Sequence, residues 1–251
     1  MPDPSALSGP SVPPRLTPLG LDGLLVTFAD SLDEAANRAA LAFRAAVDAE
    51  GWDGVTETAT SLASAYLTFD PGRTAYDGLR DRAADLLDSR DWRDAPLPAG
   101  RRRFTIPACF DGDHAPRLDD VAAAVGISRD AAIAQLCADP LRALALGYAP
   151  GQAYLGELPP AWDIARRTDL TRVPTGAVVV AVRQAIVFAT SGPTGWSQVA
   201  MTRFHGFRPD DPDRPIAIAP GDEIRLRPVS AADLDALSPP DGGVEIVEIA
   251  E

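Results

Sequence analysis

The C-terminal part of the chain consists of short apolar runs separated by glycine and proline, and this pattern constrains the fold more than any other feature. From Arg142 onward, each run with β-strand character ends after a few residues at a Gly, Pro or Asp cluster. Many short strands with such punctuation are typical of a barrel or a sandwich. The predicted strands cover residues 172–182, 185–189, 198–203, 224–229 and 244–249.

The N-terminal part combines strands with helices. Ser31 is followed three residues later by Glu34, which is the spacing of a capping box, so we expect a helix to begin there. Gly51 is expected to end that helix. The order strand, helix, strands, helix describes a small α+β unit. The predicted strands cover residues 24–28 and 55–69, and the predicted helices cover residues 35–47 and 76–87.

Between these two parts lies a stretch rich in proline and alanine, residues 95–100, which we interpret as a linker. Arg101, Arg102 and Arg103 follow it. Three arginines in a row can bind an anion, but such a run beside a linker is more often the solvated start of a strand, and we favour the second reading. A strand over 104–110 and helices over 118–125 and 129–138 come next, with Ser128 as the cap of the second helix.

These observations predict an α+β protein with three segments. They are a flexible tail over residues 1–14, an N-terminal α+β domain over residues 15–97, and a β-rich C-terminal domain over residues 98–251.

Charge and composition exclude several classes of function. Acidic residues outnumber basic ones by 36 to 23, and a surface of that sign repels phosphate backbones, so nucleic acid is not an expected partner. Every basic residue is arginine, so the chain has no lysine for a P-loop or a Schiff base. No apolar stretch reaches the roughly 18 residues of a membrane helix. No leader with a basic region and an apolar run is evident, so we expect a cytoplasmic protein without a membrane.

Few residues are suited to catalysis or metal binding. His114 and His205 are the two histidines, and neither lies beside a nucleophile-elbow pattern, so both are expected to be exposed or structural. Cys109 and Cys137 lie among apolar residues and are expected to be buried structural thiols. Asp111, Asp113 and His114 could offer oxygen and imidazole ligands, but the run lacks the further positions of a calcium loop, so we expect no metal site.

Five segments, in order, resemble those of one family. That family comprises the B-subunit of bacterial 5-oxoprolinase, allophanate hydrolase subunit 1 and the KipI inhibitor of a sporulation kinase, and it also occurs within the carboxyltransferase part of urea carboxylase. The resemblance runs from about Pro14 to Val229. The segments are IPACFD at 106–111, LDDVAAAVGIS at 118–128, GYAPGQAYLG at 147–156, RVPTGAV at 172–178 and SGPTGW at 191–196.

The resemblance implies a small N-terminal α/β sandwich domain followed by a cyclophilin-like β-barrel. It also implies a companion carboxyltransferase-like subunit, similar to the C-subunit of 5-oxoprolinase or to allophanate hydrolase subunit 2. Any ATP would be used by a partner subunit, and no cofactor is expected in this chain. The implied function is that of one subunit of a heteromeric amidohydrolase acting on a small lactam, ureido or amide substrate.

Several positions depart from the family pattern. Gln152 stands where the family has a phenylalanine, Leu136 stands where it has a histidine, and Ala177 replaces a serine. Most such changes replace a polar group with an apolar one, which removes hydrogen bonds worth about 1–3 kcal/mol each in a closed site. Arg166 and Arg167, with Arg172, remain from the family's paired Pro-Arg repeats.

The polar residues that remain suit a planar carboxylate or amide. We expect Arg172 to clamp a carboxylate, and Tyr148, Gln152 and Ser191 to orient an amide. The sequence identifies no catalytic residue. The complete set of expected substrate-binding residues is Tyr148, Pro150, Gly151, Gln152, Tyr154, Arg172, Gln184, Ser191 and Trp196.

An alternative function remains open at this stage. The same resemblance is compatible with a KipI-like binding protein that has lost catalysis and inhibits a histidine kinase or another partner. A prolyl isomerase would rest only on the cyclophilin-like architecture, and a fold does not imply a function.

Overall fold

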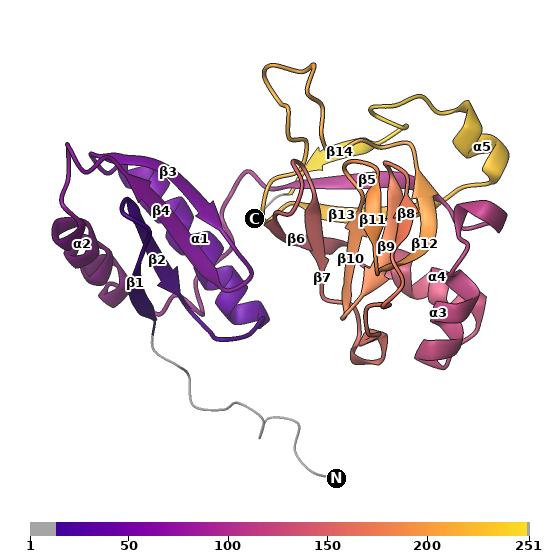
Figure 1. The fold of residues 1–251 in the computed structure, drawn as a ribbon, viewed down its shortest axis with the longest axis horizontal. Helices are drawn as coiled ribbons and strands as arrows, with labels where there is room; N and C mark the ends of the chain where they lie inside the picture. The colour runs from indigo at the N-terminus through magenta and orange to yellow at the C-terminus, as the bar shows by residue number, and fades with distance from the viewer. Residues whose placement is uncertain (1–13, 250–251) are drawn as a thin grey trace, which may run out of the picture. The chain divides into compact units, whose positions relative to one another are not determined.

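The computed structural model describes residues 14–249, so the predicted tail lies outside the described residues except for Pro14. The chain divides into two compact units, one ending at Pro98 and the other beginning at Ala99. The division falls within the stretch interpreted as a linker. Figure 1 shows the elements of each unit.

The N-terminal unit is a two-layer α/β sandwich. Its antiparallel sheet has the order β1-β2-β4-β3, and its two helices pack on one face of that sheet. Alternate residues of the central strands, such as Leu24 and Val26 in β2 and Leu67 in β4, are buried in the core beneath the helices. The elements are β1 (Arg15–Leu19), β2 (Gly23–Thr27), α1 (Glu34–Glu50), β3 (Val55–Thr60), β4 (Ser64–Phe69) and α2 (Tyr76–Asp88).

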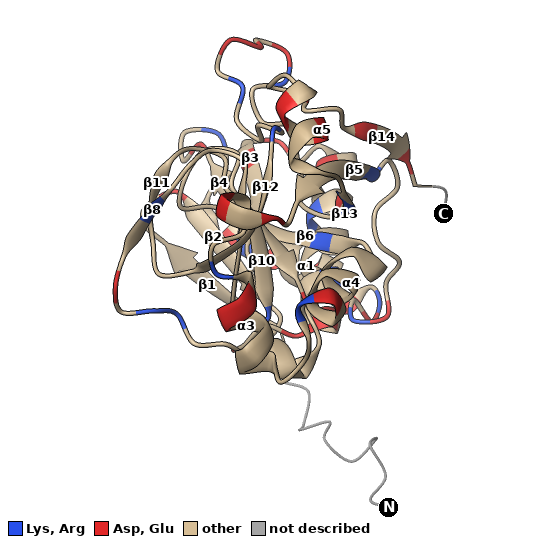
Figure 2. Ribbon diagram, turned by 90° about the vertical axis from the view of Figure 1, so that its right-hand side faces the viewer, with Lys and Arg blue, Asp and Glu red and all other residues tan. Residues whose placement is uncertain are grey.

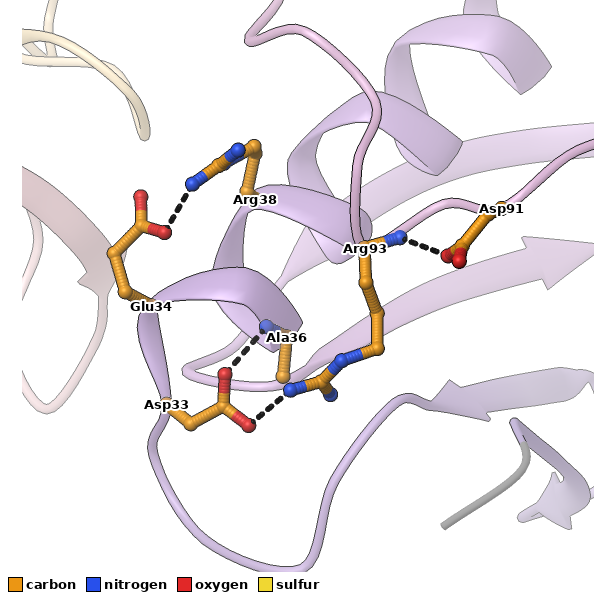
Figure 3. Close-up of polar contacts among 6 residues, drawn as sticks. All are labelled: Asp33, Glu34, Ala36, Arg38, Asp91 and Arg93. Carbon is orange, nitrogen blue, oxygen red and sulfur yellow. Dashed lines mark hydrogen bonds and ion pairs between the residues drawn. The ribbon is translucent and has the colours of Figure 1, made fainter. Parts of the chain in front are cut away.

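The start of α1 differs from the prediction, because Asp33 rather than Ser31 is the N-cap. One carboxylate oxygen of Asp33 accepts a hydrogen bond from the backbone N–H of Ala36 at 3.0 Å, and the other accepts one from Arg93 at 2.6 Å (Figure 3). A charged acceptor that satisfies both donors is a better cap here than a serine two residues upstream. The predicted end at Gly51, in the left-handed conformation, is confirmed.

Asp33 makes the stability of this unit dependent on pH. Burial alone would raise the pKa of Asp33, but the hydrogen bonds from Arg93 and Ala36 outweigh it and hold the pKa below its usual value. Asp33→Ala is therefore expected to lower the free energy of unfolding by about 1–2 kcal/mol at pH 7. Because the pKa is lowered in the folded state, this difference should be complete above about pH 4 and should shrink as the pH falls through the folded-state pKa.

Urea unfolding of Asp33→Ala at pH 7 and pH 3 measures this effect, and Ser31→Ala is the matched control. We expect Ser31→Ala to unfold like the parent chain at both values. Equal losses in the two variants at pH 7 would contradict the assignment of the cap to Asp33.

The C-terminal unit is a closed seven-stranded barrel, which confirms the α+β class with a barrel. The strands follow the order β12-β9-β10-β7-β6-β13-β5, and β12 pairs again with β5 to close the cylinder (Figure 1). Strands β5 and β13 run parallel to each other. The barrel strands are β5 (Arg102–Cys109), β6 (Leu141–Leu146), β7 (Ala153–Gly156), β9 (Ala177–Ala181), β10 (Gln184–Val187), β12 (Ser197–Thr202) and β13 (Glu223–Pro228); β14 (Glu245–Glu248) pairs with β5 outside the ring.

Two helices pack against the barrel core. Helices α3 (Leu118–Val125) and α4 (Arg129–Ala138) have the predicted bounds, and the hydroxyl of Ser128 accepts a hydrogen bond from Ala131 as expected of its cap. Leu118 and Leu136 lie in the same buried cluster as the inward side chains of the strands. Leu136, at the position where the family has a histidine, is therefore a core residue.

The predicted strand over residues 172–182 is wrong, because the chain breaks it into two strands of different sheets. Strand β8 (Thr171–Val173) pairs with β11 (Gly192–Thr194) in a ribbon outside the barrel, whereas β9 belongs to the barrel. The turn between them contains Gly176, whose φ is +84° and whose Cβ position would lie 2.5 Å from the Thr202 carbonyl oxygen. Only glycine fits there.

The remaining elements were not predicted from the sequence. Helix α5 (Ala231–Ala236) begins with a capping box formed by Ser230 and Asp233. Two single-turn 3₁₀ helices cover Gly112–His114 and Pro160–Trp162.

The three consecutive arginines after the linker form ion pairs within the chain. Arg102 pairs with Asp222 at 2.6 Å, and Arg103 pairs with Glu223 at 2.7 Å. Arg101 contacts the same glutamate at 3.5 Å. These arginines are half-buried at the start of β5, so the expectation of a solvated strand start needs correction, and no free anion site is formed there.

Candidate functional site

The candidate site is a cleft on the outer face of the barrel, and strand alternation explains why. In β7, Ala153 and Leu155 point into the barrel core, so Tyr154 between them points outward. In β10, Ala185 and Val187 point inward and Ile186 points outward. The outward residues form an apolar surface that Val173 of β8 and Trp196, in the turn after β11, partly cover.

The cleft has a volume of about 270 Å³ and lies between this surface and two segments that fold over it. One segment is the loop that leads into β8, on which Figure 2 shows basic residues. The other is the end of β11 with the turn that follows it. The lining residues are Tyr148, Gln152, Tyr154, Arg166, Arg167, Leu170, Ile186, Phe188, Pro193, Thr194, Gly195 and Trp196.

Trp196 is the fixed wall of the cleft. Its ring is buried and meets the ring of Tyr154 edge-on, with centroids 6.0 Å apart and planes at 70°. The Thr194 hydroxyl accepts a hydrogen bond from the Trp196 backbone N–H at 3.1 Å. The guanidinium carbon of Arg166 lies 5.4 Å from the Trp196 ring centroid, where a cation is attracted by the aromatic face.

Arg166 and Arg167 give the cleft a positive charge in a chain whose net charge is −13. The backbone N–H of Arg167 donates to the Gly195 carbonyl at 2.7 Å, which holds the two arginines beside Trp196. Within residues 14–249, no carboxylate forms an ion pair with either guanidinium, although most other arginines have such a partner. Two unpaired guanidinium groups in a cleft suit a carboxylate or another small anion.

The loop between β6 and β7 is both a hairpin corner and a wall of the cleft. Gly147 and Gln152 close it through a backbone hydrogen bond of 3.1 Å. Gly151, with φ at +72°, packs directly against the backbone of Gly206, where a Cβ would lie 2.6 Å from the carbonyl oxygen. Tyr148 also has a positive φ, of 68°, and is 78% exposed at the rim.

Gln152 is buried, as is Thr194 in the same cleft, but the Thr194 hydroxyl has a hydrogen-bond partner and the side-chain oxygen of Gln152 has none. The residue is only 2% exposed, and its Oε1 atom has no hydrogen-bond partner among the described residues. A buried amide without a partner is uncommon in folded proteins.

The structure brings together four of the nine expected substrate-binding residues, namely Tyr148, Gln152, Tyr154 and Trp196. The other five do not line the cleft. Pro150 and Ser191 are exposed, and Gly151 packs on Gly206. Gln184 is buried on β10, two residues before Ile186. Arg172 is exposed, because its neighbour Val173 points toward the barrel and alternation turns Arg172 away.

Sequence reasoning left Arg166 and Arg167 out of the expected site, although it had noted them in the Pro-Arg repeats. Their position depends on the contact with Gly195, about thirty residues later in the chain, so no local pattern could place them in the cleft. Leu170 and Phe188 were missed for the same reason.

The histidines and cysteines lie outside the cleft. Burial raises the pKa of the Cys137 thiol to about 11, with a smaller opposing effect of Arg225, so this thiol is protonated at neutral pH. Cys109 is fully buried. Burial and the nearby Arg208 both lower the pKa of His205. Across the described part of the chain, no three His, Cys, Asp or Glu side chains gather closely enough to hold a metal ion.

Comparison with known proteins decides the family. The carboxyltransferase domain, subdomain C and D, matches residues 14–218. The chain belongs to this family. It is similar to the 5-oxoprolinase B-subunit of Bacillus subtilis, with 23% identity over 88% of this chain and 95% of the relative. It is also similar to the 5-oxoprolinase B-subunit of Escherichia coli O157:H7, with 32% identity over 58% of this chain and 68% of the relative.

Solved structures support the same fold. The protein TTHA0988 is 29% identical, with a TM-score of 0.68 over 83% of this chain; the chain spans 40% of its length. The urea amidolyase of Kluyveromyces lactis is 16% identical, with a TM-score of 0.70 over 94% of this chain and 16% of its own. The second likeness concerns the fold alone.

In the described residues, no single helix is long and apolar enough to cross a membrane. Helices α3 and α4 satisfy the length and composition test only as a pair, and they are bent by 88° at the break between them.

Proposed function

We propose that this carboxyltransferase-family chain is the ligand-binding subunit of a cytoplasmic heteromeric enzyme of the 5-oxoprolinase or allophanate hydrolase type. It acts with a companion carboxyltransferase-like subunit on a small lactam, ureido or amide compound that carries a carboxylate. The family membership and the similarity to B-subunits of 5-oxoprolinase support this proposal.

The observation that carries the proposal is the unpaired arginine pair beside an aromatic wall. Arg166 and Arg167 hold the carboxylate of the ligand through charge-assisted hydrogen bonds. Tyr154 and Trp196 offer flat apolar surfaces to the planar amide of the same molecule. In this proposal Arg166 and Arg167 form the carboxylate clamp. The sequence had favoured Arg172 for this role.

The lining also explains why a companion subunit is needed. The described residues around the cleft provide aromatic rings, guanidinium groups, an amide and a hydroxyl, all of which bind and orient. Carboxylate, imidazole and thiol groups, which usually serve as general bases or nucleophiles, are not among them. In this proposal the companion supplies those groups, and any ATP is used by a partner subunit.

Reconstitution tests the proposal. The full chain is assayed alone and together with a carboxyltransferase-like subunit and an ATP-using subunit, for ring opening of 5-oxoproline and for hydrolysis of a ureido carboxylate. We expect no turnover by the chain alone and ATP-dependent turnover by the complex. Co-purification with a histidine kinase, without any turnover in the complex, would instead support the KipI-like inhibitor.

Gly195→Ala is expected to weaken carboxylate binding while leaving the barrel folded. A Cβ at this position would lie 2.4 Å from the Arg167 carbonyl oxygen, so the Arg166–Arg167 segment must move away from Trp196. Displacement of the arginines weakens charge-assisted hydrogen bonds to the carboxylate worth about 1.5–3 kcal/mol, so the affinity should fall about ten-fold or more. Calorimetric titration with 5-oxoproline measures it.

The matched control is Gly147→Ala in the opposite wall. A Cβ there meets nothing within 4 Å, and the residue does not have a positive φ. Equal affinity in the two variants would show that the arginine segment does not hold the ligand.

A further inference from the structure

The side chain of Gln152 has an oxygen atom that no described residue of the chain hydrogen-bonds. The residue lines the cleft, is 2% exposed, and has a buried Oε1 without a hydrogen-bond partner. Of the two polar atoms of its side chain, only Oε1 is both buried and without a partner among the described residues. The backbone of Gln152, by contrast, is fixed by hydrogen bonds to Gly147 and Ala149. The loop that carries the side chain is thus fixed, while the hydrogen-bonding capacity of the side-chain oxygen is unused.

Such an arrangement is unfavourable in the free protein. A buried amide oxygen without a partner loses its hydrogen bonds to water and gains none in return. Phe188 and Trp196 show that large apolar side chains fit in this cleft, so a buried amide is not required for packing. The arrangement is explained if a ligand completes the hydrogen bonds.

We propose that Gln152 is a specificity-determining residue that binds the amide group of the ligand. A primary amide presents a C=O acceptor and an N–H donor side by side. A lactam or a ureido group presents the complementary N–H and C=O on one edge, so the two can form a pair of parallel hydrogen bonds. This inference rests on the proposed function, in which Arg166 and Arg167 hold the carboxylate of the same molecule.

The consequence is discrimination between an amide and an ester of the same shape. A lactone that has a ring oxygen in place of the ring N–H offers two acceptors to Gln152, and one of them faces Oε1 without a proton between them. Sites built to hydrogen-bond a donor reject analogues that lack it much more strongly than they reject a change of size. The cleft therefore selects lactam or ureido carboxylates over lactone carboxylates.

The test is a titration of the full chain with two probes, 5-oxoproline and its lactone analogue. We expect the parent chain to bind the lactam at least about ten-fold more tightly than the lactone. In Gln152→Met, which keeps the length of the side chain and removes its hydrogen bonds, the two affinities should agree to within about two-fold. Gln184→Met is the matched control, because Gln184 is a buried glutamine on β10 whose Nε2 also lacks a partner but which does not line the cleft; it should keep the full preference.

Thermal unfolding of the same variants separates a binding role from a structural one. Gln152→Met removes a buried amide oxygen that has no partner in the chain, so its melting temperature should equal or exceed that of the parent chain. A lower melting temperature with unchanged preference would overturn the inference. Equal affinity of the parent chain for both probes would also overturn it and would leave the proposed function standing. Failure of 5-oxoproline to bind would contradict the proposed substrate class, and this inference with it.

Discussion

Asp222→Ala is expected to lower the free energy of unfolding of the barrel by about 3–5 kcal/mol, because it leaves a half-buried arginine without its partner. Asp222 is 2% exposed. Its Oδ2 accepts hydrogen bonds from Arg102 at 2.6 Å and from the Ala219 backbone at 2.9 Å, and its Oδ1 accepts one from the Arg102 backbone at 2.8 Å. This carboxylate joins the start of β5 to the turn before β13, the parallel neighbours of the barrel.

Native-state hydrogen exchange of the β5 and β13 amides measures this loss within the barrel. Glu223→Ala is the neighbouring control, because the Glu223 side chain is 20% exposed, against 3% for Asp222, so its pairs with Arg101 and Arg103 are better solvated and should be worth less. A loss in Asp222→Ala no larger than that in Glu223→Ala would contradict the role assigned to Asp222.

The largest expected effect on activity is that of replacing both Arg166 and Arg167 with alanine. Each guanidinium that loses its carboxylate partner removes a charge-assisted hydrogen bond, so the double variant should lose about 100-fold or more in kcat/KM in the reconstituted complex. The loss should appear mainly as a higher KM for 5-oxoproline, since both groups hold a part of the molecule that does not react. Stability should change little, because neither side chain is buried.

Arg172→Ala is the control for this pair. Arg172 is an exposed arginine of the adjacent strand β8 that does not line the cleft, so its loss should leave KM close to that of the parent complex. A higher KM in Arg172→Ala, with a normal KM in the double variant, would restore Arg172 as the carboxylate clamp and refute the arginine pair.

Local signals in the sequence were sufficient for helices α3 and α4, but not for the start of α1 or for α5. Helices α3 and α4 have the predicted bounds because Gly126 and Ser128 mark a helix end and a helix start in any context. The run 172–182 contains the turn signals Pro174 and Gly176, but its apolar character led to the prediction of one strand across them. Its division into β8 and β9 depends on the packing of Gly176 against Thr202, which is distant in sequence.

In the candidate site, too, residues that share a local motif could be predicted, whereas residues placed by contacts distant in sequence could not. Tyr148, Gln152 and Tyr154 could be predicted because they share one short motif that forms a hairpin loop and the strand after it. Arg166 and Arg167 could not, because the hydrogen bond to Gly195 that places them beside Trp196 joins two loops without regular structure. Closure of the barrel by β12 and β5 is likewise a pairing between segments about ninety residues apart.

The indole N–H signals of the tryptophans test the location of the site most directly. Three of the four tryptophans donate this proton within the chain, Trp52 to Glu50, Trp92 to backbone carbonyls of α2 and Trp162 to Gln135. Trp196 alone among them lines the cleft. On titration of the full chain with 5-oxoproline, followed by nuclear magnetic resonance with a Trp196→Phe variant for assignment, only the Trp196 signal is predicted to shift. A saturable shift of Trp52, Trp92 or Trp162 with Trp196 unchanged would place the ligand elsewhere and contradict the account.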